Sequence, residues 1–356
     1  MNFRIISILL LISAFTFSIY GCSNSEATQT SNSSVREIVD MGGRTVIVPN
    51  EIGKIFTTDP VASIYIYTFD PNRLLGWNFE LNAIERSMVL EEYHSIPIFG
   101  MGASINYEAV IAAQPTIALV VSRINDGSID RADAFTESLG IPTILLSSDL
   151  EDTPEVYRFL GELLGMEERA EKLALYVERT FYDIASMIIP RQSIARIYYG
   201  NSEDSLQTSP AGALDARVIE MINAVNVADL ELGEGSRIRI SPEQLLAWDP
   251  DVMVVNGEPR ANLSGAAAAQ LILNDPDFAS LQAVISGRVY GIPNAPFGWV
   301  ERPPGPNRVI GIRWLAKTVY PDYANFDLDK EVREFFRLFY HIELSDEQLN
   351  EVYNRF

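Results

Sequence analysis

Cysteine and histidine are scarce in this chain of 356 residues. Cys22 is the single cysteine, and His94 and His341 are the two histidines. One cysteine excludes an internal disulfide framework. Two histidines in different halves of the chain exclude a Zn or Mn site built on several imidazoles. Iron held inside a chelator is not excluded, because such a ligand brings its own donor atoms.

Positive charge is also scarce. The chain carries 48 acidic against 27 basic residues, a net charge of −21. Most of the basic residues are arginines, and the few lysines are Lys54, Lys172, Lys317 and Lys330. Such a surface repels nucleic acid and anionic lipid head groups. We therefore expect no nucleic-acid partner, and no membrane binding through charge.

Only the N-terminus contains a long apolar run. The run from Ile5 to Phe17 follows one cation, Arg4, and leads to Gly21-Cys22. Its length suits a signal sequence better than a bilayer span of roughly 20 residues. We predict a lipoprotein signal over residues 1–22, with Cys22 acylated after cleavage. The alternative is an ordinary signal peptide with an incidental thiol.

The next segment, residues 23–34 (SNSEATQTSNSS), has almost no apolar content. A stretch of this kind cannot bury a core and is typical of a flexible tether. We therefore expect an extracytoplasmic protein, anchored to the membrane by lipid.

Motifs of catalysis are missing as well. The sequence has no Gly-x-Ser-x-Gly elbow, no phosphate-binding loop and no Cys–His pair. We predict that the protein is not an enzyme and holds no resident cofactor.

What the chain does contain is an alternation of short apolar runs with helical segments, which indicates an α/β fold with mainly parallel strands. Asp130 to Leu139 is predicted as a helix that ends at Gly140. Strands are predicted at residues 45–48, 54–57, 74–76, 117–121, 143–146, 195–199, 252–255 and 289–292. Further helices are predicted at 214–224 and 308–320.

The middle of the chain differs. Residues 167–189 lack Gly and Pro, and apolar residues recur at spacings of three and four up to Pro190. This pattern predicts one amphipathic helix of roughly 35 Å. Its central position favours a rigid connector between two lobes, the alternative being an ordinary domain helix.

A sequence pattern that occurs twice in the chain supports a fold with two lobes. Residues 107–121 (YEAVIAAQPTIALVV) and 242–255 (PEQLLAWDPDVMVV) both read as a helix, a Pro-containing turn and a buried strand. Two similar halves flanking a cleft are the architecture that this repeat predicts.

Four further segments carry a resemblance to a family. They are DMGGRTVIVP at 40–49, RVYGIP at 288–293, WVERPPGPNR at 299–308 and IGIRWLA at 310–316. With the two helix–Pro–strand units and the connecting helix, they make the chain resemble the periplasmic binding proteins that serve importers of iron–siderophore complexes, haem and cobalamin.

The resemblance covers about Val35 to the C-terminus and implies two Rossmann-like α/β lobes joined by a stiff helix, which close only modestly on a ligand. The boundaries expected are 35–166 for the first lobe, 167–190 for the helix and 191–356 for the second lobe.

A cleft in such folds is built from loops at the carboxyl ends of strands. Arg123 and Arg302 would hold carboxylates, phosphates or chelate oxygens, and Trp299 would stack on a planar ligand. The alternatives are surface ion pairs and core packing. The candidate ligand-binding residues are Thr58, Asp59, Pro60, Met101, Gly102, Arg123, Tyr199, Asn201, Asn256, Phe297, Trp299 and Arg302.

The resemblance also implies docking, in which an acid on each lobe meets arginines of a permease. By position, Asp130 and Glu220 are the candidates, and the alternative for both is a solvated helix charge.

The function expected is that of a monomeric lipoprotein that delivers an iron(III)–siderophore, haem or cobalamin-type ligand to an ABC permease with its ATPase. Two alternatives stay open. One is capture of an oxyanion such as molybdate, and the other is a sensor or adhesion module without transport.

Overall fold

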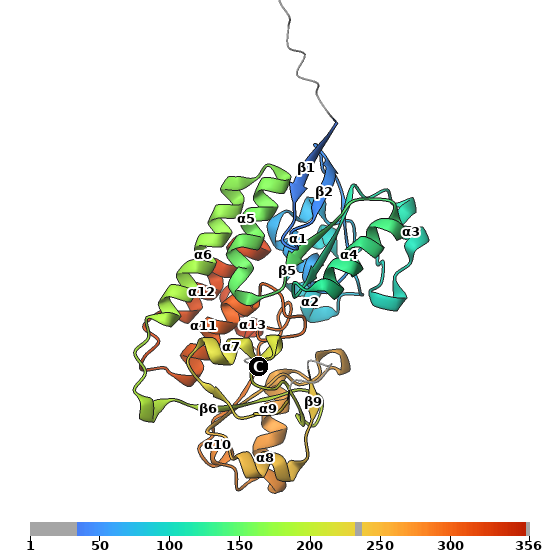
Figure 1. The fold of residues 1–356 in the computed structure, drawn as a ribbon. Helices are drawn as coiled ribbons and strands as arrows, with labels where there is room; N and C mark the ends of the chain where they lie inside the picture. The colour runs from blue at the N-terminus through green and yellow to red at the C-terminus, as the bar shows by residue number, and fades with distance from the viewer. Residues whose placement is uncertain (1–33, 232–236, 354–356) are drawn as a thin grey trace, which may run out of the picture. The chain divides into compact units, whose positions relative to one another are not determined.

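The computed structural model describes residues 34–231 and 237–353. It has a mixed α/β architecture with two lobes and mostly parallel sheets, as predicted (Figure 1). The predicted signal sequence, the tether up to Ser33 and Cys22 lie outside the described residues. Among the residues that are described, no helix combines the length and the apolar character needed to cross a bilayer.

The first lobe is built on a parallel sheet of three strands, in the order β3 (Ile55–Thr57), β4 (Ile117–Ser122) and β5 (Thr143–Ser147). Both faces are buried, as the continuous apolar runs of the strands suggest. α1 (Pro60–Phe69) and α5 (Thr153–Leu164) pack with one face. α4 (Asp126–Leu139) packs against the other face.

Two expectations for this lobe need correction. The predicted strand at 45–48 is β2 (Thr45–Pro49), which pairs antiparallel with β1 (Val35–Val39) instead of joining the parallel sheet. The segment 74–76 forms only an isolated bridge through Leu74. The shorter elements are α2 (Ala83–Ser87), α3 (Tyr107–Ala112), η1 (Pro71–Arg73), η2 (Glu91–Tyr93), η3 (Gly102–Ser104) and η4 (Leu150–Asp152).

α4 begins four residues earlier than predicted, because Asn125 caps it: the Asn125 side chain accepts from the Ser128 N–H at 3.0 Å. Its end at Gly140, in the left-handed conformation, agrees with the prediction.

The second lobe contains a four-stranded parallel sheet. Its order is β11 (Val289–Gly291), β10 (Val252–Val255), β6 (Arg196–Gly200) and β8 (Val225–Asn226). A two-residue pair, β7 (Gln207–Thr208) and β9 (Ile238–Arg239), is antiparallel. The helices are α7 (Arg217–Met221), α8 (Pro242–Trp248), α9 (Gly265–Asn274) and α10 (Gln282–Ile285), with η5 (Arg191–Ser193), η6 (Leu214–Ala216), η7 (Pro259–Ala261) and η8 (Pro276–Phe278). The predicted helix 214–224 is therefore split into η6 and the short α7.

The two segments with the repeated sequence pattern form matching structural units. α3 leads to β4 and α8 leads to β10, and each of these strands has a neighbour on both sides in its sheet. Both turns place a residue with positive φ, Gln114 or Asp249, directly before the proline. The two lobes thus repeat one helix–turn–strand unit.

The long central helix, α6 (Glu167–Ala185), is shorter than predicted. Its buried stripe ends at Ile184, and Ile188, expected on the same face, is 87% exposed. Ile189 is disfavoured in a helix by the following Pro190, and the helix stops four residues before its predicted end at Ile189. Its 19 residues span about 28 Å.

One core connects the lobes. In β6 and β10, Ile197, Tyr199, Val252 and Val254 face the same cluster as α1, α5 and α6, whereas the alternate residues face a separate cluster. α11 (Arg308–Val319), α12 (Leu328–Phe335), η9 (Phe336–Tyr340) and α13 (Asp346–Val352) complete the chain. In Figure 1, α6 runs beside α5 and α12, and the rings of Tyr176 and Phe335 are 6.0 Å apart. A shared core of this kind limits the relative motion of the lobes.

Candidate functional site

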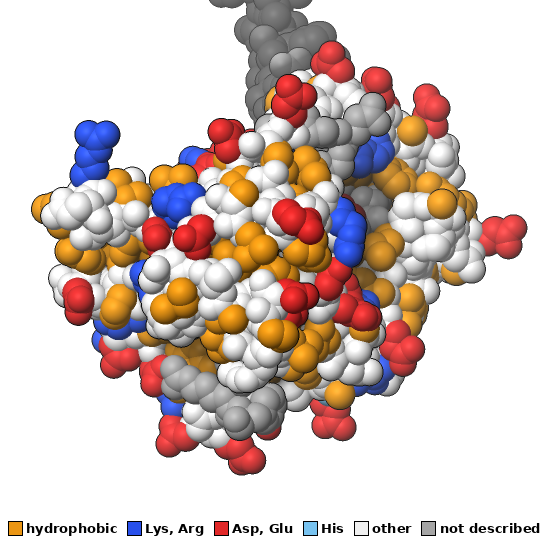
Figure 2. Space-filling model, turned by 90° about the horizontal axis from the view of Figure 1, so that it is seen from below, with side chains coloured by type: hydrophobic (Ala, Val, Ile, Leu, Met, Phe, Trp, Pro, Cys, Tyr) orange, Lys and Arg blue, Asp and Glu red, His pale blue; other side chains and the backbone are white. Residues whose placement is uncertain are grey.

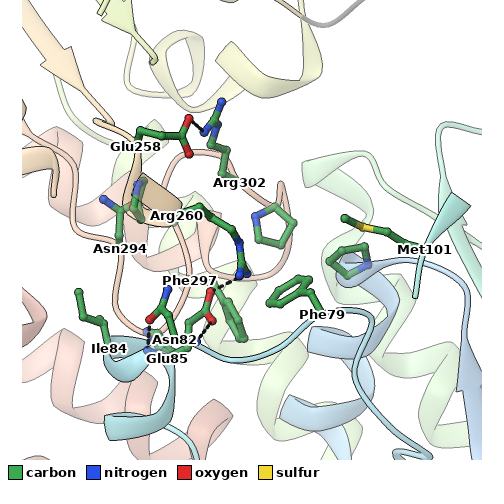
Figure 3. Close-up of a pocket in the computed structure, with 15 residues that line it drawn as sticks. Phe79, Asn82, Ile84, Glu85, Met101, Glu258, Arg260, Asn294, Phe297 and Arg302 are labelled. Atoms are coloured by element: carbon green, nitrogen blue, oxygen red, sulfur yellow. Dashed lines mark hydrogen bonds and ion pairs between the residues drawn. The ribbon is translucent and has the colours of Figure 1, made fainter. Parts of the chain in front are cut away.

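A cavity of about 460 Å³ lies between the two lobes, within the size range of small-molecule sites. Figure 3 shows residues of both lobes around it. Its apolar lining includes Pro60, Phe79, Ile84, Met101 and Phe297. Its polar lining includes Asn82, Glu85, Glu258, Arg260, Asn294 and Arg302.

The first-lobe wall is fixed by the side chain of Asn78. Its amide donates to the Thr57 carbonyl at 2.8 Å and to the Gly100 carbonyl at 3.1 Å. Gly100 has a φ of +83°, and a Cβ there would lie 2.2 Å from the Ser104 carbonyl oxygen, so only glycine fits. This tight turn presents Met101, which is about half exposed, to the cavity.

A capping box places Glu85. Asn82 Oδ1 accepts from the Glu85 N–H at 2.9 Å, and the Glu85 carboxylate accepts from the Asn82 N–H at 2.7 Å. The carboxylate also meets Arg260 of the second lobe at 3.0 Å, so this ion pair crosses the cavity. Burial raises the pKa of Glu85, and the Arg260 charge opposes that shift.

Arg260 has a second contact in the first lobe. Its guanidinium lies 4.1 Å from the centre of the Phe79 ring, within the range of a cation–π interaction. Phe79 in turn meets Phe297 edge to face at 6.4 Å. The floor of the cavity is therefore aromatic and carries a cation.

The second-lobe wall is the loop after β11, residues 293–307. Asn307 donates to the Phe297 carbonyl at 3.1 Å. A Cβ at Gly298 would lie 1.9 Å from the Glu301 carbonyl oxygen, so this close approach requires glycine. Arg302 is held at a φ of +70°, a conformation that costs energy for a residue other than glycine and is concentrated at functional sites.

Two carboxylates balance the positive charge of this wall. The Arg302 guanidinium binds Glu258 at 2.5 Å at the edge of the cavity. Glu301 is buried and accepts from the Tyr199 hydroxyl at 2.6 Å and from Arg237. Burial and the nearby Asp215 raise the pKa of Glu301, and Arg237 opposes them. With its apolar faces and two arginines, the cavity suits a planar or bulky ligand that carries acceptor oxygens.

Four of the predicted ligand-binding residues line this cavity: Pro60, Met101, Phe297 and Arg302. Pro60 begins α1, Met101 lies in the turn after Gly100, and Phe297 and Arg302 lie in the loop after β11, and the first three contribute apolar surface. Their role in binding a ligand stays a prediction.

Trp299 was expected to stack on a planar ligand, and its burial in the core contradicts this expectation. Its side chain is fully buried, its ring nitrogen donates to the Ala295 carbonyl at 3.0 Å, and it packs edge to face with Tyr353. Tyr199, also proposed as a stacking residue, is fully buried and bonded to Glu301. The alternative of core packing holds for both.

The other candidates lie around the cavity without lining it. Thr58 is buried and donates to the Leu119 carbonyl, and Asp59 caps α1 and accepts from the Val121 N–H at 3.1 Å. Gly102 follows Met101 in the exposed turn. Arg123 is exposed and lies 3.8 Å from Asp149, which is the surface ion pair considered as its alternative.

Asn201 and Asn256, predicted in cleft loops, are fully buried behind the second-lobe wall. The Asn294 side chain, which lines the cavity, donates to the Asn256 carbonyl at 3.2 Å.

The two residues predicted to contact the permease differ in exposure and in their ion pairs. Asp130 is exposed in the N-terminal half of α4. Glu220 is partly buried in α7, where it pairs with Arg217 at 2.6 Å and accepts from the Gly212 N–H. Arg217 also binds Glu151 of the first lobe at 2.5 Å. Glu220 therefore takes part in a network at the lobe junction.

Sequence reasoning missed the residues that contribute most to the charge and aromatic content of the cavity, namely Phe79, Glu85, Glu258 and Arg260. One signal was available: Glu258 and Arg260 follow directly after Asn256-Gly257, at the end of a predicted strand. The run Asn82-Ala83-Ile84-Glu85 has the spacing of a capping box.

Acidic side chains are spread over the face drawn in Figure 2, and basic ones stand apart from one another among them. In residues 34–231 and 237–353, no group of three His, Cys, Asp or Glu side chains is placed to hold a metal ion.

The sequence matches the family described as Periplasmic binding protein over residues 82–296. No curated protein matches it. Among solved structures, an ABC transporter solute binding protein from Sulfurospirillum deleyianum is 25% identical, with a TM-score of 0.78, over 90% of this chain and 99% of its own.

Two more distant structures share the fold. The molybdate periplasmic binding protein MolA of Haemophilus influenzae, bound to molybdate, is 21% identical with a TM-score of 0.69, over 87% of this chain and 99% of its own. The triscatecholate siderophore binding protein FeuA of Bacillus subtilis, complexed with ferri-bacillibactin, is 15% identical with a TM-score of 0.60, over 81% of this chain and 99% of its own.

Proposed function

The chain belongs to the periplasmic binding protein family, whose members bind a small solute outside the cytoplasm and work with an ABC permease, and we propose that its solute is an iron(III)–siderophore, haem or cobalamin-type ligand. Proteins of this family are not enzymes. In this proposal the monomeric protein holds the ligand between its lobes and delivers it to the permease and its ATPase.

The observation that carries the proposal is the composition of the cavity. Phe79 and Phe297 offer ring surface, and Met101 offers an adaptable apolar side chain. Arg260 and Arg302, each paired with a glutamate of the lining, offer their remaining N–H donors at the edge. A bulky chelate or tetrapyrrole presents both a large apolar face and acceptor oxygens, so it matches both kinds of lining. A ligand of this type supplies its own metal donors.

The siderophore complex of FeuA, on the same fold, is compatible with this ligand class. MolA, also on this fold, binds molybdate, so a small oxyanion is the alternative that the experiment must separate.

The route to the membrane belongs to the same proposal. A signal over residues 1–22, acylation of Cys22 and a tether over 23–34 would keep the protein at the outer side of the cell membrane. Asp130, exposed on α4, is the proposed contact with the permease on the first lobe. Glu220 is the proposed contact on the second lobe, where docking would compete with Arg217.

The test is a thermal-shift and calorimetric screen of the mature protein, from Ser23 onward, against ferric siderophores, haem, cobalamin, molybdate, tungstate and free divalent metals. A ligand at 100 times its dissociation constant stabilises the fold by about 2.7 kcal/mol, a clear rise in melting temperature. We expect that rise with one ferric chelate or tetrapyrrole. A rise with molybdate or tungstate alone would replace this ligand class with the oxyanion.

Matched aromatic variants locate the binding. Phe79→Ala should weaken binding of the ligand found in the screen, because it removes a ring of the cavity floor. Tyr182→Ala removes an exposed aromatic ring of α6, far from the cavity lining, and should leave the affinity unchanged. Equal effects of the two substitutions would argue against the cavity. Absence of any ligand would favour a sensor or adhesion module.

A further inference from the structure

Behind the second-lobe wall lies a group of buried polar side chains that the cavity does not use. Asn201, Thr208, Ser209 and Asn256 are each fully buried. Within the described part of the chain, Asn201 Nδ2, Thr208 Oγ1, Ser209 Oγ and both amide atoms of Asn256 have no hydrogen-bond partner. A buried polar atom without a partner costs about 1–3 kcal/mol, so four such residues in one place require an explanation.

The backbone brings these residues together. Asn201 and Asn256 follow β6 and β10 at the carboxyl ends of neighbouring parallel strands, and the Asn256 N–H donates to the Gly200 carbonyl at 2.8 Å. The Asn201 N–H donates to the Gln207 carbonyl at 2.7 Å, and Thr208 and Ser209 follow Gln207 in the chain. Because side chains alternate along a strand, Asn201 and Asn256 both point to the face of the sheet that carries Tyr199 and Val254.

Two arginines complete the group. The Tyr199 hydroxyl bonds to both Asn201 and Glu301, and Glu301 is paired with Arg237. Arg302 follows Glu301 in the chain. Arg237 and Arg302 each use a terminal nitrogen for their carboxylate, and among the described residues their buried Nε atoms have no hydrogen-bond partner, although Arg302 Nε lies 4.0 Å from the Glu301 carboxylate.

Most of the atoms without partners in this group are donors. Of the seven atoms without partners, four are nitrogens that only donate, two are hydroxyls that do either, and one, Asn256 Oδ1, only accepts. Water both donates and accepts, so ordered water is the competing occupant that the crystal structure described below separates. An oxyanion brings acceptor oxygens alone.

The surrounding charges are balanced. Arg237 faces Glu301, Arg302 faces Glu258, and the buried Arg308 and Asp215 act on each other. An oxyanion would therefore be held by hydrogen bonds to neutral amides and hydroxyls and to the two arginine Nε atoms, without a buried excess of negative charge from the protein.

We infer that Asn201, Thr208, Ser209 and Asn256, with the Nε atoms of Arg237 and Arg302, form an inner subsite for an oxyanionic group. The subsite adjoins the cavity, because Arg302 lines the cavity with Glu258 and Asn294, and Asn294 bonds to the Asn256 carbonyl. The oxyanion is either a free tetrahedral ion or an acidic substituent of a larger ligand seated in the cavity.

The experiment measures binding by calorimetry with three free oxyanions, namely molybdate, sulfate and phosphate, and separately with ferric chelates that carry or lack a free acidic group. The variants are Thr208→Val and Ser209→Ala. The control is Thr143→Val, since Thr143 in β5 is also fully buried and its hydroxyl also lacks a partner in the described structure. Removing a buried hydroxyl that has no partner also removes its desolvation cost, so none of the three variants should be less stable than the parent.

We expect Thr208→Val and Ser209→Ala each to weaken oxyanion binding about tenfold to a hundredfold, the effect of losing one hydrogen bond to a charged group, and Thr143→Val to change nothing. An effect on the free ions identifies a free oxyanion as the ligand, and an effect confined to acid-bearing chelates identifies a substituent.

A crystal structure with tungstate, read by its anomalous signal, gives a second measurement. A peak between Asn201 and Asn256 is expected, whereas ordered water alone at this position would overturn the inference. If chelates bind in the cavity and neither Thr208→Val nor Ser209→Ala affects any acidic ligand, the subsite is wrong and the proposed function stands. If an oxyanion binds here and no chelate binds, the proposed chelate function fails and the subsite stands.

Discussion

The two walls of the cavity differ in side-chain polarity, in exposure and in backbone conformation. The first-lobe wall offers Phe79, Ile84 and Met101, apolar side chains that are partly exposed. The second-lobe wall is a buried loop with one residue, Arg302, in the left-handed region. Behind it lie seven of the eleven buried side-chain atoms that lack a partner in the described structure.

This difference suggests that the two walls make different contributions to ligand binding. Apolar surface is non-directional, so the first-lobe wall contributes contact area and tolerates differences in ligand shape. Unpartnered donors and a strained backbone are maintained only where the surrounding packing enforces them, so the second-lobe wall fixes the orientation of a polar group. Substitutions in the two walls should therefore differ in their effects on stability and on ligand affinity.

The largest expected effect is on the packing beneath the second-lobe wall. Trp299→Ala should lower the free energy of unfolding by about 3–5 kcal/mol, because it leaves a cavity and removes a buried bond to Ala295. Ile84→Ala, in the partly exposed first-lobe wall, should change it by about 0.5 kcal/mol or less. Urea denaturation measures both. Similar losses for the two would show that the walls are equally dependent on packing.

A smaller effect is expected for the arginines. Arg302→Asn keeps a residue that tolerates positive φ and removes the guanidinium. It should weaken binding of an acidic ligand about tenfold or more, since hydrogen bonds to charged groups contribute about 1.5–3 kcal/mol. Arg123→Asn removes an exposed arginine that does not line the cavity and should leave the affinity unchanged. Calorimetry with the ligand found in the screen decides between them, and equal losses would point to long-range charge.

The same comparison explains what the sequence could predict. β10 was predicted at its observed bounds, Val252–Val255, because a short apolar run before a turn is a local signal. Met101 and Arg302 were predicted because strand ends meet at one edge of a sheet, and both line the cavity. Those inferences need only local pattern and topology.

The failures have a different origin. Trp299 stands in a Gly- and Pro-rich segment that is typical of an exposed loop, yet tertiary packing against Tyr353 buries it. Arg260 and Glu85 meet only because the lobes face each other, and nothing in their local patterns encodes that distance. α6 ends at Ala185 although the apolar spacing continues to Ile188, so periodicity alone does not fix the end of the helix.

The smallest expected effect concerns Glu85, the buried carboxylate of the first-lobe wall. Burial raises its pKa above the ordinary value of 4.5, so above that pH the folded state holds this proton more tightly than the unfolded state does. The contribution of Glu85 to stability should then fall as the pH rises from about 4.5 towards the raised pKa. Glu85→Gln keeps the capping box and removes the titration.

The free energy of unfolding of the parent minus that of Glu85→Gln should therefore decrease as the pH is raised from 4 to 7. Glu85→Gln also removes the half-exposed ion pair with Arg260, which should lower the unfolding free energy of the variant by about 0–1 kcal/mol at neutral pH. This loss increases the difference between parent and variant, whereas the burial of Glu85 decreases it. Urea denaturation across the pH range gives the difference, and Glu80→Gln, an exposed neighbour, controls for the loss of one negative charge. A difference that increases with pH would mean that the attraction of Arg260 for the Glu85 carboxylate exceeds the cost of burying its charge. The two lobes would then be held together across the cavity by charge, and the first-lobe wall would be no less electrostatic than the second.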